Sequence, residues 1–265
     1  MPEPVPPDFR SIQLAEGKKV FFASDFHLGA PDAARSLERE KRIVRWLGSV
    51  QSEAQVLFLV GDIFDFWFEY RRAIPKGFVR LQGKLAELTD AGTEVVFFTG
   101  NHDMWMFDYF TRELGIPVHR QPQRYLINGV SFFIGHGDGL GPGDHVYKLL
   151  KRVFASRISQ WLFARFHPNL GIGLANQWSR RSRINHARKP EQFLGEDEWL
   201  LAYSRQIEQR QHHDYYIFGH RHLPLDLDVT AGDGTPSRYI NLGEWVNYRT
   251  YARFDGRQVV LTEYK

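Results

Sequence analysis

The hydrophobic pattern of the first hundred residues alternates between short apolar runs and segments with helical spacing. The runs at 19–24, 56–60 and 94–99 are mostly apolar and β-prone, which predicts strands buried on both faces. Between them, residues 35–50 and 76–90 carry apolar side chains three and four positions apart, as amphipathic helices do. The order strand, helix, strand, helix, strand predicts parallel strands joined by right-handed crossovers.

The later pattern consists of shorter strands with one helical region between them. Strands are predicted at 118, 125–127, 130–134, 214–218, 225–230, 238–241, 250–254 and 258–262, and Asn128-Gly129 favours a tight hairpin turn. Helices are predicted at 103–114, 147–154, 158–166, 170–178 and 196–211. We therefore expect one domain over residues 1–265, with a parallel half, an antiparallel half and a helical cap inserted at about 141–195.

Composition and charge narrow the class of protein. Apolar residues at 43% and charged residues at 25% are ordinary for a soluble globular chain, and the absence of cysteine excludes disulfides and thiolate metal sites. Residues 1–10 lack the basic and apolar regions of a signal peptide, and no apolar run reaches the 18 or so residues that a membrane span needs. The net charge of +3 hides an asymmetry, because residues 145–190 contain ten Lys/Arg and no Asp or Glu.

Five of the predicted strands end in residues with carboxylate, carboxamide or imidazole groups. In chain order these ends read Asp25-x-His27, Gly61-Asp62, Gly100-Asn101-His102-Asp103, Gly135-His136 and Gly219-His220-Arg221-His222. Four of the five place a glycine directly before the polar group, which allows the backbone to turn sharply. The carboxyl ends of strands are where open α/β sheets bind their ligands.

These donor groups suit divalent metal ions of intermediate hardness, such as Mn²⁺, Fe²⁺ or Zn²⁺. In two-metal sites the ions lie about 3.5–4 Å apart and one carboxylate can bridge them, and the central position of Asp62 predicts that role. A single His or Asp after a strand is usually a turn former or surface group, but five such strand ends are poorly explained in that way. The other histidines are interpreted as structural or solvent-facing: His119, His145, His167, His186, His212 and His213.

With these motifs the chain resembles the calcineurin-like metallophosphoesterases over about residues 20–263. The resemblance implies a mixed α/β fold, a double β-sheet sandwich flanked by helices, with two divalent metal ions in the strand-end loops. It implies that one ion is bound by Asp25, His27 and His222, the other by Asn101, His136 and His220, and both by Asp62. It also implies in-line attack on phosphorus by a hydroxide held by the metals. The catalytic group would be Asn101, His102 and Asp103, with His102 assisting the leaving group or transition-state charge and Asp103 orienting it.

A narrower resemblance begins at His136. The string HGDGL, the basic insertion that returns at GHRH, and segments 61–67 and 240–256 are similar to the UDP-2,3-diacylglucosamine pyrophosphatases of lipid A synthesis. That family cleaves its glycolipid nucleotide to UMP and 2,3-diacylglucosamine 1-phosphate (lipid X) at the cytoplasmic face of the inner membrane, typically with Mn²⁺. The resemblance implies substrate contacts at Asn101, His102, Asp144, Tyr147, Ser179, Arg183 and His220.

The insertion has a composition that suits such a substrate. Its bulky apolar residues would wall an acyl-chain groove, and its arginines would meet the diphosphate or an anionic membrane surface. The apolar set is Leu149, Leu150, Val153, Phe154, Ile158, Trp161, Leu162, Phe163 and Phe166, and the basic set is Arg180, Arg181, Arg183, Arg188 and Lys189. The alternative is an ordinary helical hairpin that packs its apolar stripe on the core and leaves its arginines in solvent.

One position departs from the narrower family, whose best-known members carry Arg where this chain has His102. The leaving group of a diphosphate cleavage is itself a phosphate with a second pKa of about 6, so it needs little general acid. Either side chain can then serve by stabilising charge.

Two rival functions remain open from the sequence. One is a metallophosphoesterase for soluble phosphodiesters or nucleic acid, with the basic segment following phosphates. Nucleic acid is disfavoured, because the apolar residues of the segment are bulky and helically spaced. The other is a non-enzymatic scaffold with a degenerate metal site, which a complete ligand set argues against. No obligate protein partner is inferred.

Overall fold

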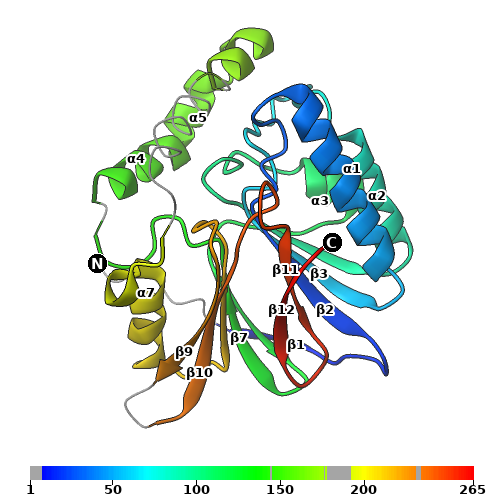
Figure 1. Ribbon diagram of the computed structural model, residues 1–265. Coiled ribbons are helices and arrows are strands. Elements are labelled where there is room, and N and C mark those ends of the chain that lie inside the picture. The colour runs from blue at the N-terminus through cyan, green and yellow to red at the C-terminus, as the bar shows by residue number, and fades with distance from the viewer. Residues whose placement is uncertain (1–7, 144, 176, 178–191, 231–233) are drawn as a thin grey trace.

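Two six-stranded sheets face each other in the computed structural model, which describes residues 8–143, 145–175, 177, 192–230 and 234–265 (Figure 1). Sheet 1 has the strand order β12-β11-β2-β3-β4-β5, and sheet 2 has the order β1-β6-β7-β8-β10-β9. The strands of sheet 1 are β2 (Lys19–Ala23), β3 (Ala54–Val60), β4 (Glu94–Phe98), β5 (Val118–His119), β11 (Thr250–Phe254) and β12 (Val259–Glu263). Those of sheet 2 are β1 (Phe9–Ile12), β6 (Gln123–Ile127), β7 (Val130–Ile134), β8 (Tyr215–Phe218), β9 (Pro224–Thr230) and β10 (Pro236–Leu242).

Helices cover the outer face of each sheet. The helices are α1 (Ala33–Val50), α2 (Val79–Asp90), α3 (Tyr109–Leu114), α4 (His145–Ala155), α5 (Arg157–Phe163) and α7 (Trp199–Glu208), with a 3₁₀ turn η1 (Gly195–Asp197). Residues 168–175 are also helical. Figure 1 shows α1–α3 on one side of the sandwich, α7 on the other, and α4 and α5 rising beyond the strand ends.

Alternation along the strands builds three apolar layers. In β2, Val20 and Phe22 pack between the two sheets, whereas Phe21 and Ala23 face the helices α1 and α2. Phe218 of β8 belongs to a third layer under α7. Period-two alternation with both faces buried is what a sandwich flanked by helices requires, and it confirms the predicted fold class.

Two predictions about the elements were wrong, and one strand was missed. Both sheets are mixed, so the chain has no separate parallel and antiparallel halves: β11 joins β2 antiparallel in sheet 1, and β7 pairs with β8 in parallel in sheet 2. Residues 103–108 are not helical, because the helix begins only at Tyr109. The short strand β1, which pairs in parallel with β6, was not predicted.

Candidate metal centre

The five predicted strand ends meet at one edge of the sandwich. Strands β2, β3 and β4 pair in parallel in sheet 1, so their carboxyl ends lie side by side. Strands β7 and β8 pair in parallel in sheet 2 and bring His136 next to the loop of His220 and His222. The site therefore lies where the ends of the two sheets come together.

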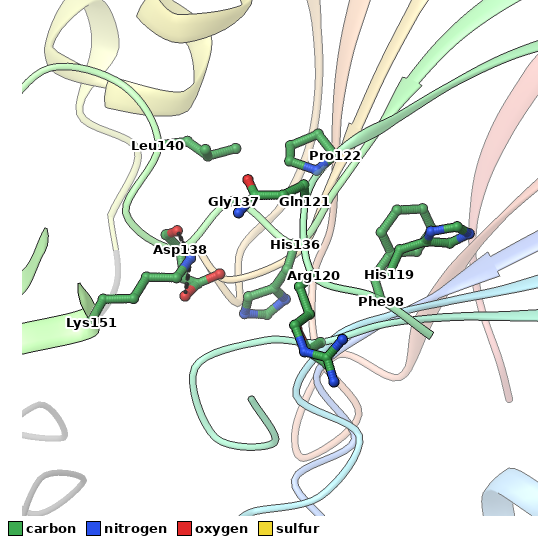
Figure 2. Close-up of a pocket in the computed structure, with 11 residues that line it drawn as sticks. Phe98, His119, Arg120, Gln121, Pro122, His136, Gly137, Asp138, Leu140 and Lys151 are labelled. Atoms are coloured by element: carbon green, nitrogen blue, oxygen red, sulfur yellow. Dashed lines mark hydrogen bonds and ion pairs between the residues drawn. The ribbon is translucent and has the colours of Figure 1, made fainter. Parts of the chain in front are cut away.

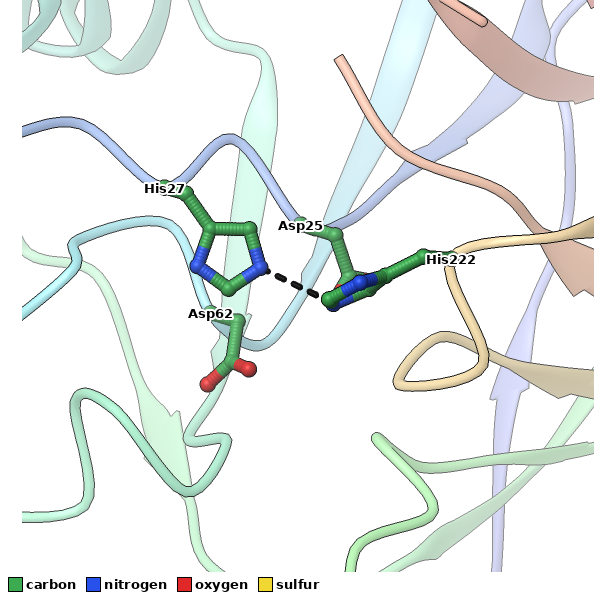
Figure 3. A group of neighbouring side chains, drawn as sticks. All are labelled: Asp25, His27, Asp62 and His222. Carbon is green, nitrogen blue, oxygen red and sulfur yellow. Dashed lines mark hydrogen bonds and ion pairs between the residues drawn. The ribbon is translucent and has the colours of Figure 1, made fainter. Parts of the chain in front are cut away.

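The first group of donor atoms comprises Asp25, His27, Asp62 and His222, whose ligand atoms lie within 4.8 Å of one another (Figure 3). Nε2 of His27 lies 3.0 Å from Nε2 of His222, and Oδ1 of Asp25 lies 3.2 Å from Nε2 of His222. Three of the four side chains are buried. Imidazole nitrogens and carboxylate oxygens that point at one another in a buried space form a set of donors suited to a divalent cation.

The second group comprises Asp62, His136 and His220. Nδ1 of His136 lies 2.8 Å from the carbonyl oxygen of Val60, so the ring donates from Nδ1 and presents Nε2 to Oδ2 of Asp62 at 3.3 Å. A backbone carbonyl that fixes the tautomer of a histidine is the usual support of a metal ligand. Asp62 belongs to both groups, as a bridging carboxylate would.

Four buried atoms of the candidate ligands lack a hydrogen-bond partner among the described residues: Oδ1 of Asp25, Nδ1 of His27, Oδ1 of Asn101 and Nε2 of His136. Orphaned buried acceptors are costly, and native structures satisfy them with a ligand, an ion or water. The donor set and the orphaned atoms thus fit two divalent cations. The assignment of individual ligands stays a prediction.

The backbone at the candidate ligands adopts an unusual conformation. Asp25, His27, Asp62, His220 and His222 all have φ between 45° and 68°. The left-handed region is uncommon for residues other than glycine and persists where the surroundings impose it. These residues themselves make the sharp turns at the strand ends.

The glycines before the ligands have a different role from the predicted one. Of Gly61, Gly100, Gly135 and Gly219, only Gly61 has a positive φ, at 83°. A Cβ atom at Gly100 would collide with Oδ1 of Asp62, and one at Gly219 would lie 2.5 Å from Oδ2 of Asp25. These glycines leave room for the side chains of the neighbouring strand ends.

The electrostatics of the centre reflect the crowding of these groups. Burial alone would raise the pKa of Asp25, but its contacts with His222 and His27 hold it below the usual value. Burial likewise opposes charge on His136, yet the charge of Asp62 and its contact with the ring raise the pKa of His136 to about 10. Burial and the charge of His136 lower the pKa of His220 to about 4. A metal ion would replace the proton on Nε2 of His136.

The predicted pairing of His102 with Asp103 is wrong. Nδ1 of His102 lies 2.9 Å from the carbonyl oxygen of Asp65 and 3.5 Å from Oδ1 of the same residue. The carboxylate of Asp103 instead accepts the backbone N–H of Gly100 at 2.7 Å and of Ile63 at 2.8 Å, with longer contacts to two further N–H groups. The buried carboxylate of Asp103 therefore connects the loops after β3 and β4 by hydrogen bonds.

The cap-side predictions have mixed outcomes. Tyr147 lies near the site and donates its hydroxyl to Oδ2 of Asp138 at 2.9 Å. Asp144, Ser179 and Arg183 lie outside the described residues. Lys151 of α4 pairs with the same carboxylate at 2.8 Å, beside His136, as Figure 2 shows. The adjoining pocket has a volume of about 20 Å³, which is room for about one water molecule and too small for a phosphate.

The cap helices are attached to the sandwich by aromatic contacts. Phe163 packs on Phe66, Phe68 and Trp105, and the indole of Trp105 donates to the carbonyl of Phe154 at 2.9 Å. No residue of α4 or α5 is buried. Apart from Phe154 and Phe163, the predicted groove residues are exposed: Leu149, Leu150, Val153, Ile158, Trp161, Leu162 and Phe166. The alternative of a hairpin that packs its whole apolar stripe on the core is thus wrong for the described helices.

Sequence reasoning missed Asp65, Asp138 and Arg221. Asp65 lies three residues after Asp62 and approaches two imidazoles, His27 at 3.7 Å and His102 at 3.5 Å. The second aspartate of the string GDIFD was the feature of the sequence that could have identified it. Asp138 and Arg221 stand inside the HGD and GHRH strings, and their contacts with α4 and α7 could be found only from the fold.

Comparison with known proteins agrees with this geometry. Residues 18–224 match the family model described as calcineurin-like phosphoesterase. The chain is 38% identical over 256 residues to the UDP-2,3-diacylglucosamine hydrolase of Porphyromonas gingivalis, covering 92% of this chain and 96% of that protein. It is 28% identical over 253 residues to the protein of the same name from Azotobacter vinelandii, with 91% and 96% covered.

Proposed function

The chain belongs to the calcineurin-like phosphoesterase family, and on that premise we propose that it hydrolyses the diphosphate of UDP-2,3-diacylglucosamine to UMP and 2,3-diacylglucosamine 1-phosphate. The observation that carries the proposal is the pair of donor groups that share Asp62, in a chain so similar to hydrolases named for that substrate. Diphosphate hydrolysis is a reaction that paired metal ions perform by acting on both the attacking and the leaving oxygen.

The residues that would hold the metals follow from the two groups. Asp25, His27 and His222 would bind one ion, Asn101, His136 and His220 the other, and Asp62 both. Mixed oxygen and nitrogen donors suit Mn²⁺, with Fe²⁺ and Zn²⁺ as alternatives. When bound, the metals would supply an activated water and neutralise charge on the phosphoryl oxygens.

His102 acts on the substrate from the edge of this centre. Its Nδ1 is engaged by the carbonyl of Asp65, which leaves Nε2 for a phosphoryl oxygen. Burial lowers the pKa of His102 to about 4, against the opposing charge of Asp62. An anionic diphosphate favours the charged imidazolium, so substrate binding promotes the form that donates from Nε2. The departing sugar phosphate needs little proton transfer, because its second pKa is about 6.

The cap supplies the surface for the lipid part of the substrate. Its exposed apolar residues include Leu149, Ile158 and Trp161, and the same helices carry Lys148, Lys151, Arg152 and Arg157 without an acidic residue. Apolar and basic side chains together bind acyl chains and anionic headgroups. The protein would act at the cytoplasmic face of the inner membrane as a peripheral protein. None of the described helices is long and apolar enough to span a bilayer.

The domain organisation belongs to the same proposal. Residues 1–265 would form one phosphoesterase domain, and the cap at about 141–195 would be its insertion for the glycolipid. Substrate contacts are proposed for Asn101, His102, Tyr147 and His220, and for Asp144, Ser179 and Arg183 outside the described residues. No obligate protein partner is proposed.

The test is turnover of UDP-2,3-diacylglucosamine with Mn²⁺, compared with bis-p-nitrophenyl phosphate and a short single-stranded oligonucleotide. We expect release of UMP from the lipid substrate, loss of that activity in Asp62→Asn, and loss on chelation that added Mn²⁺ restores. Turnover of the generic diester without any lipid turnover would overturn the substrate assignment and leave the metal site standing. Efficient cleavage of the oligonucleotide would favour the nucleic-acid alternative.

A further inference from the structure

Arg221 lies between two candidate ligands that belong to different metal groups. His220 precedes it and His222 follows it. The side chain of Arg221 is buried, and its guanidinium donates from Nε to Oε1 of Glu198 at 2.7 Å and from Nη2 to Oε2 at 3.1 Å. Glu198 is fully buried and directly precedes α7. The two side chains thus form a bidentate ion pair with both partners out of solvent.

The guanidinium has two further contacts with the same stretch of chain. Nη2 of Arg221 also donates to the carbonyl of Gln192 at 3.1 Å, and the group lies 4.4 Å from the ring centroid of Trp199. Gln192, Glu198 and Trp199 belong to the segment by which the chain returns from the cap to α7. The loop after β8 is therefore fastened through one side chain to the start of α7 and, through Gln192, to the end of the cap.

This loop needs a fixed anchor because its backbone conformation is disfavoured. His220 has φ of 68° and His222 has φ of 51°, and residues other than glycine keep such angles only where the surroundings enforce them. In sheet 1 the ligand loops hold each other by backbone bonds, from Asp25 N–H to Gly61 at 3.0 Å and from His27 N–H to Asp62 at 2.9 Å. Arg221 gives the loop of sheet 2 a corresponding restraint.

We propose that the Glu198–Arg221 ion pair is a positioning element that holds His220 and His222 for metal binding from the start of α7. The planar guanidinium meets the carboxylate through two parallel bonds, which fixes its orientation as well as its distance. Since His220 and His222 belong to different donor groups, one ion pair positions ligands of both metals. The inference rests on the ligand roles in the proposed function.

The experiment measures the affinity of the full-length protein for Mn²⁺, by titration with detection of the free ion by electron paramagnetic resonance. We expect Glu198→Gln to weaken Mn²⁺ binding about 10-fold, the size typical of changes in groups that support metal ligands. Arg221→Lys keeps a positive charge but loses the two-pronged contact with Glu198 and the contact with Trp199, so its Mn²⁺ affinity should fall to a similar extent, about 10-fold.

The matched control is Glu208→Gln, at the other end of α7. Glu208 is also buried and accepts the hydroxyl of Tyr216 at 2.5 Å and the N–H of His213 at 3.1 Å, so its replacement disturbs α7 without touching the loop after β8. Its Mn²⁺ affinity should stay within about twofold of wild type. Hydrolysis of bis-p-nitrophenyl phosphate by Glu198→Gln should recover as Mn²⁺ is raised, and no such response is expected for Glu208→Gln.

Each outcome decides a different point. Wild-type affinity in Glu198→Gln and Arg221→Lys, or an equal loss in Glu208→Gln, overturns the positioning role. If Glu198→Gln gives no folded protein, Arg221→Lys alone decides. Mn²⁺ binding that is absent in the wild type, or unchanged in His222→Ala, overturns the ligand assignment of the proposed function and the inference with it.

Discussion

Oδ1 of Asp62 lies so close to Gly100 that it would collide with the Cβ atom of any larger residue at that position. The φ of Gly100 is not in the left-handed region, so the glycine is required by the space and not by the turn. Because Asp62 is the one residue common to both donor groups, an added methyl group at position 100 displaces the donor on which both metals would depend.

Gly100→Ala should therefore cost activity and also stability, because the backbone nitrogen of Asp62 lies 2.7 Å from the same Cβ position. A displacement of about 1 Å in a reacting centre reduces turnover about 10²-fold, and we expect at least that loss in kcat/KM on bis-p-nitrophenyl phosphate. Gly83→Ala is the control, since Gly83 lies in α2 with open space around its Cβ position. That variant should keep full activity and gain about 1 kcal/mol of unfolding free energy. Equal activity in the two variants would contradict the packing argument.

His102 should be replaceable by arginine but not by alanine. His102→Ala removes the donor to the phosphoryl oxygen and should lower kcat about 10²-fold, whereas His102→Arg should stay within about 10-fold of wild type. The loss in His102→Ala should be the same across aryl phosphodiesters of rising leaving-group pKa, because the residue stabilises charge. A loss that grows with the leaving-group pKa would instead identify His102 as a general acid.

Binding of the cap to membranes should depend on its exposed apolar residues. Ile158→Glu places a charge on the apolar surface of α5 and should weaken partition of the protein to vesicles with anionic lipids about 10-fold, measured by co-sedimentation. Val79→Glu is matched in exposure, since Val79 of α2 is 73% exposed and Ile158 is 72% exposed. Val79 lies on the sandwich and not on the cap, so this variant should bind as wild type. An equal effect of both changes would argue against docking through the cap.

His213 should make the protein sensitive to mild acid. Burial, with the nearby Arg124 whose Nε lies 3.2 Å from the ring, lowers the pKa of His213 to about 4. Because the ordinary value is about 6.5, the unfolded chain takes up the proton first, so stability is full above pH 6.5 and falls as the pH drops towards 4. Between pH 7 and pH 5, urea denaturation of wild type should lose about 2 kcal/mol more than His213→Gln. His145→Gln, at an exposed position of α4, controls for the loss of a histidine as such.

The clustering of the candidate ligands could be predicted from the sequence because the information there is local. Asp25, Asp62 and His136 each follow an apolar strand after one intervening residue, and the carboxyl ends of parallel strands come together in any α/β arrangement. The predicted strand limits were close to those observed for the same reason, since each run is bounded by glycine or polar residues.

Relationships across the fold could not be predicted in this way. The pairing of β11 with β2 joins residues that are more than 200 positions apart, and no local pattern indicates it. The choice between Asp65 and Asp103 as the partner of His102 depends on how the loop after β4 turns, and Asp103 turns inward to backbone N–H groups. The ion pair of Arg221 with Glu198 depends on the path of the chain out of the cap.

Each donor group takes side chains from both sheets: His222 joins Asp25 across the gap, and His136 joins Asp62. A cation bound in either group would therefore link the two sheets. Its binding free energy would add to the free energy needed to separate them. A partly folded chain with only one sheet formed would present an incomplete set of metal ligands. Metal binding would thus stabilise only the complete sandwich. Removal of the metal by a chelator would lower the stability of the whole fold as well as remove the ions from the active centre.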